Sequence, residues 1–186
     1  CIHPCYTADP KELLRDSAVK VARVVGFPFG ANTTAVKLVE AVESVKNGAD
    51  ELDVVINISA LKSENYNLVG MEIRNIINVT RHVVHKIIIE TCYLTDEEKI
   101  KAALLAVEAG ALFIKTSTGF GSKGASVADV ALLKKTVSDR AYIKAAGGIR
   151  DLKTVTEMVQ AGASRIGTSS GVKIIEEFIN ASSNHP

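Results

Sequence analysis

The sequence has almost no excess of charge, few cysteines and no long apolar run. With 22 basic and 21 acidic side chains in 186 residues, the formal net charge is +1. Such a balance offers no basic surface to neutralise a nucleic acid backbone or an anionic membrane. Apolar runs such as Ile87–Ile89 are far shorter than the roughly 20 residues of a membrane-spanning helix. We therefore expect a soluble protein that binds neither nucleic acid nor membrane.

The three cysteines, Cys1, Cys5 and Cys92, cannot all pair with one another. An apolar content of 47% is sufficient for a core without disulfides, so we expect free thiols and a cytoplasmic location. Cys1 and Cys5 around His3 could in principle hold a metal, but no second pair of Cys or His ligands follows them. A thiol that is buried or faces a substrate is the better expectation.

Short β-branched segments alternate with longer segments of helical periodicity along the chain. Strands are expected at Cys1–Tyr6, Val19–Val25, Glu51–Ile58, Lys86–Thr91, Leu112–Thr116, Ala141–Ala145 and Arg165–Gly167. Helices are expected after them at Asp9–Ser17, Thr33–Asn47, Glu64–His82, Thr95–Ala109, Ser126–Val137, Leu152–Ala161 and Ser170–Asn180. Seven βα units in succession, with no linker between them, predict one parallel β/α domain over residues 1–186.

The predicted helix ends carry chemical signals of their own. Thr95 and Glu98 have the spacing of a capping box, and Asp151 precedes another helix as a cap. Three helices end at a glycine within a small-residue unit, at Gly48, Gly110 and Gly162. Glycine takes the left-handed conformation of a helix C-cap without steric cost.

The distribution of polar residues favours a closed barrel over an open doubly wound sheet. No G-x-G-x-x-G motif follows the first strand, so the dinucleotide-binding signature is absent. Polar residues recur at the carboxyl ends of many strands, where a barrel collects its functional side chains: Asp53, Asn57, Glu90, Lys115, Lys144 and Thr168. We predict a (β/α)8 TIM barrel whose first strand unit is missing from this chain.

Two lysines stand at corresponding points of neighbouring predicted strands. Lys115 and Lys144 each interrupt an otherwise apolar strand, and one such lysine alone could simply pair with a carboxylate or extend to solvent. Two ammonium groups about 4 Å apart repel by about 4 kcal/mol at an effective dielectric of about 20. One of them must then be partly neutral, and a neutral amine beside a cation is activated as a carbonyl nucleophile.

Asp53 is the acid that could lie between the two lysines. It shares one face of its predicted strand with Val55 and Asn57. It could simply balance Lys144, or it could pass protons through a water molecule, and the two roles are compatible.

Glycine-rich turns follow the last two predicted strands. Gly147 and Gly148 follow one strand, and Gly167 is followed by Thr168, Ser169 and Ser170 at the start of a helix. Backbone N–H groups at such turns bind anions, and phosphate sites after the last two strands recur in barrels. Together the turns predict a phosphorylated small-molecule substrate.

Several of these motifs together resemble the deoxyribose-phosphate aldolase family. They are Gly26–Gly30, Gly48–Asp53, Ile89–Thr91, Phe113–Gly119, Lys144–Arg150 and Arg165–Ser170. The resemblance implies a barrel enzyme that needs neither metal nor other cofactor and interconverts 2-deoxy-D-ribose 5-phosphate with D-glyceraldehyde 3-phosphate and acetaldehyde. A homodimer is also possible for such an enzyme.

The same resemblance assigns roles to individual residues. It implies that Lys115 forms the Schiff base, that Lys144 lowers the pKa of Lys115, and that Asp53 works with a bound water. It places Cys1 at the mouth of the site and gives phosphate contacts to Thr118, Gly119, Gly147, Gly148, Ser169 and Ser170.

Two parts of the family pattern are absent. No strand precedes Cys1, and no tyrosine follows Tyr142 to act as the C-terminal tyrosine of some relatives. Because the chain begins with Cys and has no secretory leader, we expect an excerpt of a larger domain. Two other functions remain open: another phosphosugar barrel, such as an isomerase or decarboxylase, and a truncated, non-catalytic paralogue.

Overall fold

A computed structural model describes residues 1–6 and 12–183. Its six-stranded parallel sheet consists of β1 (Ala22–Val25), β2 (Glu51–Val55), β3 (Val84–Ile88), β4 (Phe113–Lys115), β5 (Tyr142–Ala146) and β6 (Ala163–Gly167). The strands lie side by side in chain order, β1 to β6, whereas a doubly wound sheet reverses its order at a switch point. The predicted TIM-barrel architecture is therefore confirmed, although the ring is incomplete.

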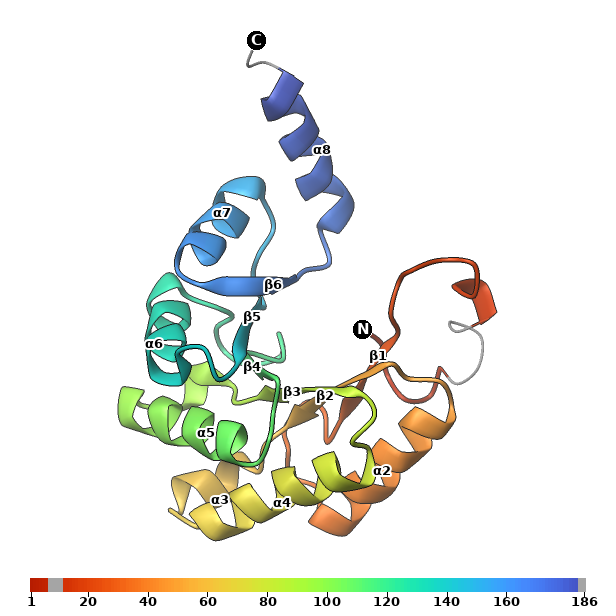
Figure 1. Ribbon diagram of the computed structural model, residues 1–186. Helices are drawn as coiled ribbons and strands as arrows, with labels where there is room; N and C mark the ends of the chain where they lie inside the picture. The colour runs from red at the N-terminus through yellow and green to blue at the C-terminus, as the bar shows by residue number, and fades with distance from the viewer. Residues whose placement is uncertain (7–11, 184–186) are drawn as a thin grey trace.

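Helices cover the outer face of the curved sheet (Figure 1). They are α2 (Thr34–Lys46), α3 (Ile58–Lys62), α4 (Tyr66–Val79), α5 (Asp96–Glu108), α6 (Val127–Val137), α7 (Leu152–Gln160) and α8 (Gly171–Ser183), with a 3-10 turn, η1, at Thr91–Tyr93. Most strand residues on the outer face are apolar and buried against these helices; Leu52, Val54, Ile87, Ile114 and Ile143 are examples. Arg23 and His85 are buried polar residues on the same face. Because side chains alternate along a strand, every second residue is left to face the interior of the ring.

The predicted helix caps are present. Thr95 and Glu98 form a reciprocal capping box at the start of α5, and the Asp151 side chain accepts a hydrogen bond from the Thr154 amide at the start of α7. Gly48, Gly110 and Gly162 have φ values of 89°, 99° and 111°, as expected for helix C-caps.

The strand expected at Cys1–Tyr6 is shortened to one bridge. Ile2 pairs in parallel with Arg23, through hydrogen bonds to Ala22 and Val24. Pro4 has no amide hydrogen with which to continue a ladder, and a turn from His3 to Tyr6 follows. Part of the helix expected at Asp9–Ser17 lies outside the described residues. The described chain thus has six strands and a bridge, where seven strands were expected.

Several predicted boundaries also need correction. The strand expected to extend to Ile58 ends at Val55, because the Asn57 side chain caps α3 by accepting from the Ala60 amide. The helix expected at Glu64–His82 is present as α4, and an additional short helix, α3, precedes it, with Glu64 turning the chain between the two at φ 57°. Asn57 is therefore a cap, not a side chain on the inner face of β2.

The remaining strands also differ in their bounds from the expected ranges, most of all β3 and β1. β3 covers Val84–Ile88, where Lys86–Thr91 was expected, because Glu90 turns the chain with φ 55° into η1. β1 begins at Ala22, three residues after the expected Val19.

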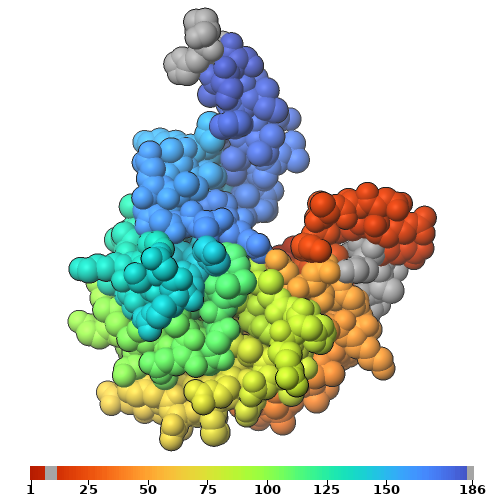
Figure 2. Space-filling view, viewed as in Figure 1, coloured from red at the N-terminus to blue at the C-terminus, as the bar shows by residue number. Residues whose placement is uncertain are grey.

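The ring is open between its first and last units. In Figures 1 and 2, α8 projects from the body, and a broad notch separates it from the N-terminal segment. α7 and α8 each bury a single side chain, Met158 and Ile174, while Val172 and Phe178 on α8 are 77% and 55% exposed. Within the described ranges, no helix combines the length and apolar composition needed to cross a membrane.

Candidate active site

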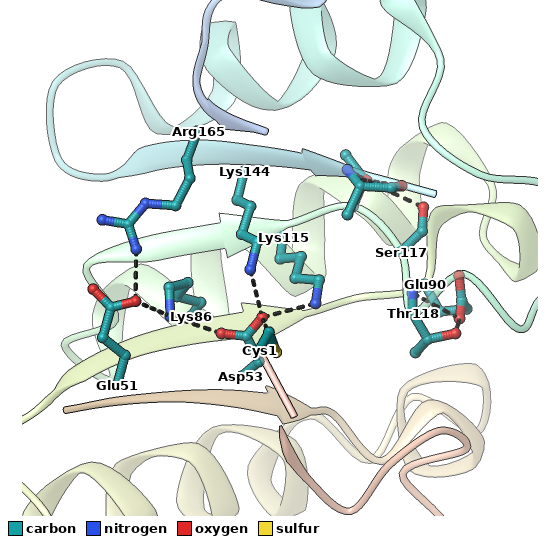
Figure 3. Close-up of polar contacts among 12 residues, drawn as sticks. Cys1, Glu51, Asp53, Lys86, Glu90, Lys115, Ser117, Thr118, Lys144 and Arg165 are labelled. Atoms are coloured by element: carbon teal, nitrogen blue, oxygen red, sulfur yellow. Dashed lines mark hydrogen bonds and ion pairs between the residues drawn. The ribbon is translucent and has the colours of Figure 1, made fainter. Parts of the chain in front are cut away.

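The inner face of the sheet carries a compact group of charged side chains. Strand alternation directs inward Glu51 and Asp53 from β2, Lys86 from β3, Lys115 from β4, Lys144 from β5 and Arg165 from β6 (Figure 3). In the strand register Asp53 lies beside Lys86, while Lys115 lies beside Lys144. We call Lys115 and Lys144 the lysine pair.

Asp53 lies at the centre of this group and is fully buried. Its Oδ2 atom is 2.7 Å from Lys115 Nζ and 2.8 Å from Lys144 Nζ, and its Oδ1 atom is 2.7 Å from Lys86 Nζ. The prediction that an acid lies between the lysine pair and balances Lys144 agrees with this geometry. One carboxylate therefore forms ion pairs with three ammonium groups.

Burial and charge act in opposite directions on this group. Burial alone would raise the pKa of Asp53, but the charges of Lys115, Lys144 and Lys86 hold that pKa far below its usual range. Burial, and then the charge of Lys115, lowers the pKa of Lys144 despite its ion pair with Asp53. Asp53 is therefore ionised at every physiological pH, and Lys144 gives up its proton more readily than a solvated lysine.

A second carboxylate lies on the same face of β2, two residues before Asp53. Glu51 Oε2 is 2.7 Å from Lys86 Nζ and 2.7 Å from Arg165 Nη1. The guanidinium carbon of Arg165 lies 4.6 Å from the centre of the Phe113 ring. Glu51, Lys86 and Arg165 were not among the predicted site residues, although the i, i+2 spacing of Glu51 and Asp53 places both carboxylates on one face.

A pocket of about 520 Å³ opens above the lysine pair, at the carboxyl ends of the strands. Eight of the ten predicted site residues line it: Cys1, Lys115, Thr118, Gly119, Lys144, Gly147, Gly148 and Ser169. Asp53 lies beneath them with no exposed surface. Ser170 is not among the lining residues, and its amide donates to the Thr168 hydroxyl at 2.9 Å.

The glycine turns bring backbone close to the pocket. Gly147 and Gly148 have φ values of 88° and 77°, a region that residues with a side chain rarely adopt. A Cβ atom on Gly147 would lie 2.9 Å from the Cα of Gly124. The loop between β4 and α6 can therefore pack this closely only against a residue that has no side chain. Arg150, which was not among the predicted site residues, also lines the pocket.

Glu90 holds the loop that carries Thr118. Its Oε2 atom accepts hydrogen bonds from both the amide and the hydroxyl of Thr118, and the Cys92 thiol donates to Oε1. The Thr118 hydroxyl oxygen in turn accepts from the Phe120 amide at 3.0 Å. Since both donors of Thr118 are directed to Glu90, its predicted phosphate contact would require them to be redirected.

The rim of the pocket combines a thiol with aromatic rings. Cys1 Sγ lies 3.7 Å from Asp53 Oδ2. Phe27 makes edge-to-face contacts with His3 and Phe120, at centroid distances of 5.5 and 5.4 Å. The pocket therefore has one apolar wall, while its glycine turns provide a polar one.

Comparison with known proteins identifies the family. A family model described as DeoC/LacD family aldolase matches residues 1–177. The chain belongs to this aldolase family. It is 54% identical over 181 residues to the deoxyribose-phosphate aldolase of Caldanaerobacter subterraneus subsp. tengcongensis, covering 96% of this chain and 78% of that protein.

Solved aldolase structures share the fold over nearly the whole chain. The aldolase QR15 superposes with a TM-score of 0.95 at 48% identity, covering all of this chain and 83% of that one. The deoxyribose phosphate aldolase from Aeropyrum pernix, described as tetrameric, superposes with a TM-score of 0.88 at 35% identity, covering 96% of this chain and 76% of that one.

Proposed function

We propose that this member of the aldolase family cleaves 2-deoxy-D-ribose 5-phosphate reversibly to D-glyceraldehyde 3-phosphate and acetaldehyde, through a Schiff base on Lys115. The observation that carries the proposal is the lysine pair on Asp53 at the floor of the pocket. Relatives that are 53–54% identical to this chain are named deoxyribose-phosphate aldolases, which supports the choice of substrate.

Lys115 is the nucleophile in this proposal. Its Nζ atom attacks the C1 aldehyde of the open-chain sugar, and loss of water leaves an iminium ion. The positive charge of Lys144 lies beside Lys115, and a neighbouring cationic group is an arrangement that activates an amine as a nucleophile. The two side chains are only 6% and 7% exposed, so the charges interact with little screening by water.

The iminium ion then acts as the electron sink for cleavage. Removal of the C3 hydroxyl proton breaks the C2–C3 bond, releases glyceraldehyde 3-phosphate and leaves an enamine on Lys115. Protonation at C2 and hydrolysis of the resulting imine release acetaldehyde and restore the amine. Lys144, with its lowered pKa, and the ionised Asp53 are suited to pass these protons, directly or through a water molecule.

The phosphate of the substrate is placed at the glycine turns. Gly119, Gly147, Gly148 and Ser169 line the pocket there, and backbone N–H groups in such turns favour anions. Arg150, which lines the same pocket, would add a positive charge.

Borohydride trapping tests this function. Incubation with the phosphorylated sugar and borohydride, followed by peptide mass spectrometry, should show a reduced adduct on Lys115 that Lys115→Ala lacks. Lys86→Met serves as the matched control for a lysine of the same group outside the pocket lining, and it should retain the adduct. Turnover without any adduct would instead favour a barrel isomerase or decarboxylase, and neither adduct nor turnover would favour a non-catalytic paralogue.

Location, assembly and cofactor requirement belong to the same proposal. Cys1, Cys5 and Cys92 are all free thiols, which supports a cytoplasmic location. The tetrameric description of the Aeropyrum pernix relative supports self-association, with a homodimer as its smallest form. No metal enters any proposed step, since the iminium ion takes the place of a Lewis acid.

A further inference from the structure

The charged side chains inside the ring form a continuous series of ion pairs, in which positive and negative groups alternate. Arg165 bonds to Glu51, Glu51 to Lys86, and Lys86 to Asp53, each at 2.7 Å. Asp53 then bonds to the lysine pair. Figure 3 shows this continuous path from Arg165 on β6, through β2 and β3, to the floor of the pocket.

Three members of this series of ion pairs, Glu51, Lys86 and Arg165, do not reach the pocket. Neither Glu51, Lys86 nor Arg165 is among the residues that line it, whereas Lys115 and Lys144 are. Glu51 and Lys86 are nearly or fully buried, so their charges act on the interior more than on solvent. The contacts of Glu51 therefore reach the lysine pair through Lys86 and Asp53, whereas the charge of Arg165 also acts on Lys144 directly.

We propose that Glu51 and Arg165 are positioning residues for the aldolase reaction. Through Lys86 they set how much of the negative charge of Asp53 is left for the lysine pair. This inference rests on the proposed function for its catalytic meaning, but its electrostatic content can be measured without turnover.

The two residues act in opposite directions. Glu51 draws Lys86 away from Asp53, which leaves more of the Asp53 charge to stabilise the protonated lysine pair. Arg165 occupies the same oxygen of Glu51 and so weakens that pull. Its own positive charge also contributes to the lowered pKa of Lys144.

Other charged groups near Glu51 must be considered in any pH experiment. A second cavity of about 420 Å³ below it is lined by Glu51, Lys20, Asp50 and His82. Lys20, Asp50 and His82 are the charged or titratable groups that share this cavity with Glu51, and His82 is the one histidine among them. A His82→Gln background removes this histidine, and all variants should be compared in it.

The main test compares two variants of opposite charge change. Glu51→Gln removes a negative charge, so the acid limb of the pH profile of kcat/KM should move to lower pH by about one unit. Arg165→Gln removes a positive charge, so the same limb should move to higher pH by a similar amount. In the double variant Arg165 and Glu51 are both absent, so only the direct charge effect of Arg165 offsets the loss of Glu51, and the limb should lie between those of Glu51→Gln and the parent protein.

A chemical readout separates this inference from the proposed function. Competitive acetylation with a trace of acetic anhydride modifies only unprotonated amines, and mass spectrometry of the Lys144 peptide gives its labelling midpoint. The midpoint should shift down in Glu51→Gln and up in Arg165→Gln, even if the protein proved to have no aldolase activity. Arg165→Lys, which restores the charge, should return it toward the parent value.

Glu72→Gln is the matched control. Glu72 is also a buried carboxylate paired with a buried lysine, Lys37 at 2.5 Å, but it belongs to α4 outside the ring. Its variant should lose stability without moving either midpoint. Shifts of the same sign in Glu51→Gln and Arg165→Gln, or unchanged midpoints in both, would overturn the inference.

Discussion

Lys115 and Lys144 are partners across adjacent parallel strands, and their Nζ atoms lie 2.7 and 2.8 Å from the same oxygen of Asp53. One carboxylate oxygen cannot fully neutralise two buried ammonium groups. The energetic conflict favours release of a proton from one of them. The strand register therefore places two buried amines against one carboxylate oxygen.

Replacing Lys144 should separate its electrostatic role from that of the nucleophile. In Lys144→Met, the acid limb of kcat/KM should move to higher pH by about one to two units, because the substitution removes one positive charge from the buried group around Asp53. The maximal rate should fall by about 100-fold or more as a proton-transfer group is lost. Stopped-flow measurement of imine formation across pH 5 to 10 checks both effects.

Lys144→Arg supplies the control for this experiment. It retains a positive charge but cannot exchange a proton in this pH range. It should preserve the position of the acid limb and still lower the maximal rate. An unmoved limb in Lys144→Met would contradict the electrostatic account.

The polar wall of the pocket should determine the preference for the phosphorylated sugar over the unphosphorylated one. Ser169→Glu places a negative charge among the lining residues, so KM for deoxyribose 5-phosphate should rise at least about tenfold, equivalent to about 1.4 kcal/mol. KM for unphosphorylated deoxyribose should change little. Ser169→Gln controls for side-chain size, and equal losses on both sugars would argue against a phosphate site here.

His85 should make the fold sensitive to mild acid. Burial, with the charges of Lys86 and His82, lowers the pKa of His85 to about 4. The Thr80 hydroxyl lies 2.7 Å from both the Ile76 carbonyl and His85 Nε2. Since its one hydrogen goes to the carbonyl, neutral His85 donates to the hydroxyl oxygen.

The direction of the pH effect follows from this lowered pKa. Unfolding lets His85 take up a proton below its ordinary pKa of about 6.5, so its contribution is intact above that pH. The free energy of unfolding should then fall by up to about 3 kcal/mol as the pH drops from about 6.5 to about 4. Urea unfolding of His85→Gln should show a flatter pH dependence, whereas His82→Gln, which leaves the burial of His85 and the charge of Lys86 in place, should keep most of the parent's pH dependence. An unchanged slope in His85→Gln would refute this assignment.

The fold could be predicted largely because its signals are local. The capping box at Thr95 and the glycine ends at Gly48, Gly110 and Gly162 are set by neighbouring residues. The end of β2 was wrong because Ile56 and Ile58 suit a strand as well as a helix, and only the Asn57 cap decides between them. The segment at Cys1–Tyr6 failed as a strand because Pro4 interrupts its pairing.

The lysine pair at the floor of the pocket could be predicted from the sequence, but the contact between Glu51 and Arg165 could not. Lys115 and Lys144 stand out because each interrupts an apolar strand and because their units are adjacent. The contact between Glu51 and Arg165 joins residues 114 positions apart and depends on the curvature of the whole sheet. No local pattern encodes that approach, and only the alternation of β2 hinted at Glu51.

The open side of the ring leads to a prediction about self-association. On one side of the gap only the Ile2 bridge protects β1, and on the other β6 has no further described strand beside it. Unpaired strand edges recruit other chains, and the apolar face of α8 at Val172 and Phe178 is largely exposed.

We propose that a further βα unit completes the ring, and that residues 1–186 expressed alone associate with one another and turn over substrate poorly. Light scattering with size-exclusion chromatography, thermal melting and retro-aldol assays measure this directly. Val172→Lys with Phe178→Lys should reduce association if α8 mediates it and leave it unchanged if the strand edges do, whereas a monomeric, cooperatively melting and fully active chain would show that six strands and one bridge suffice.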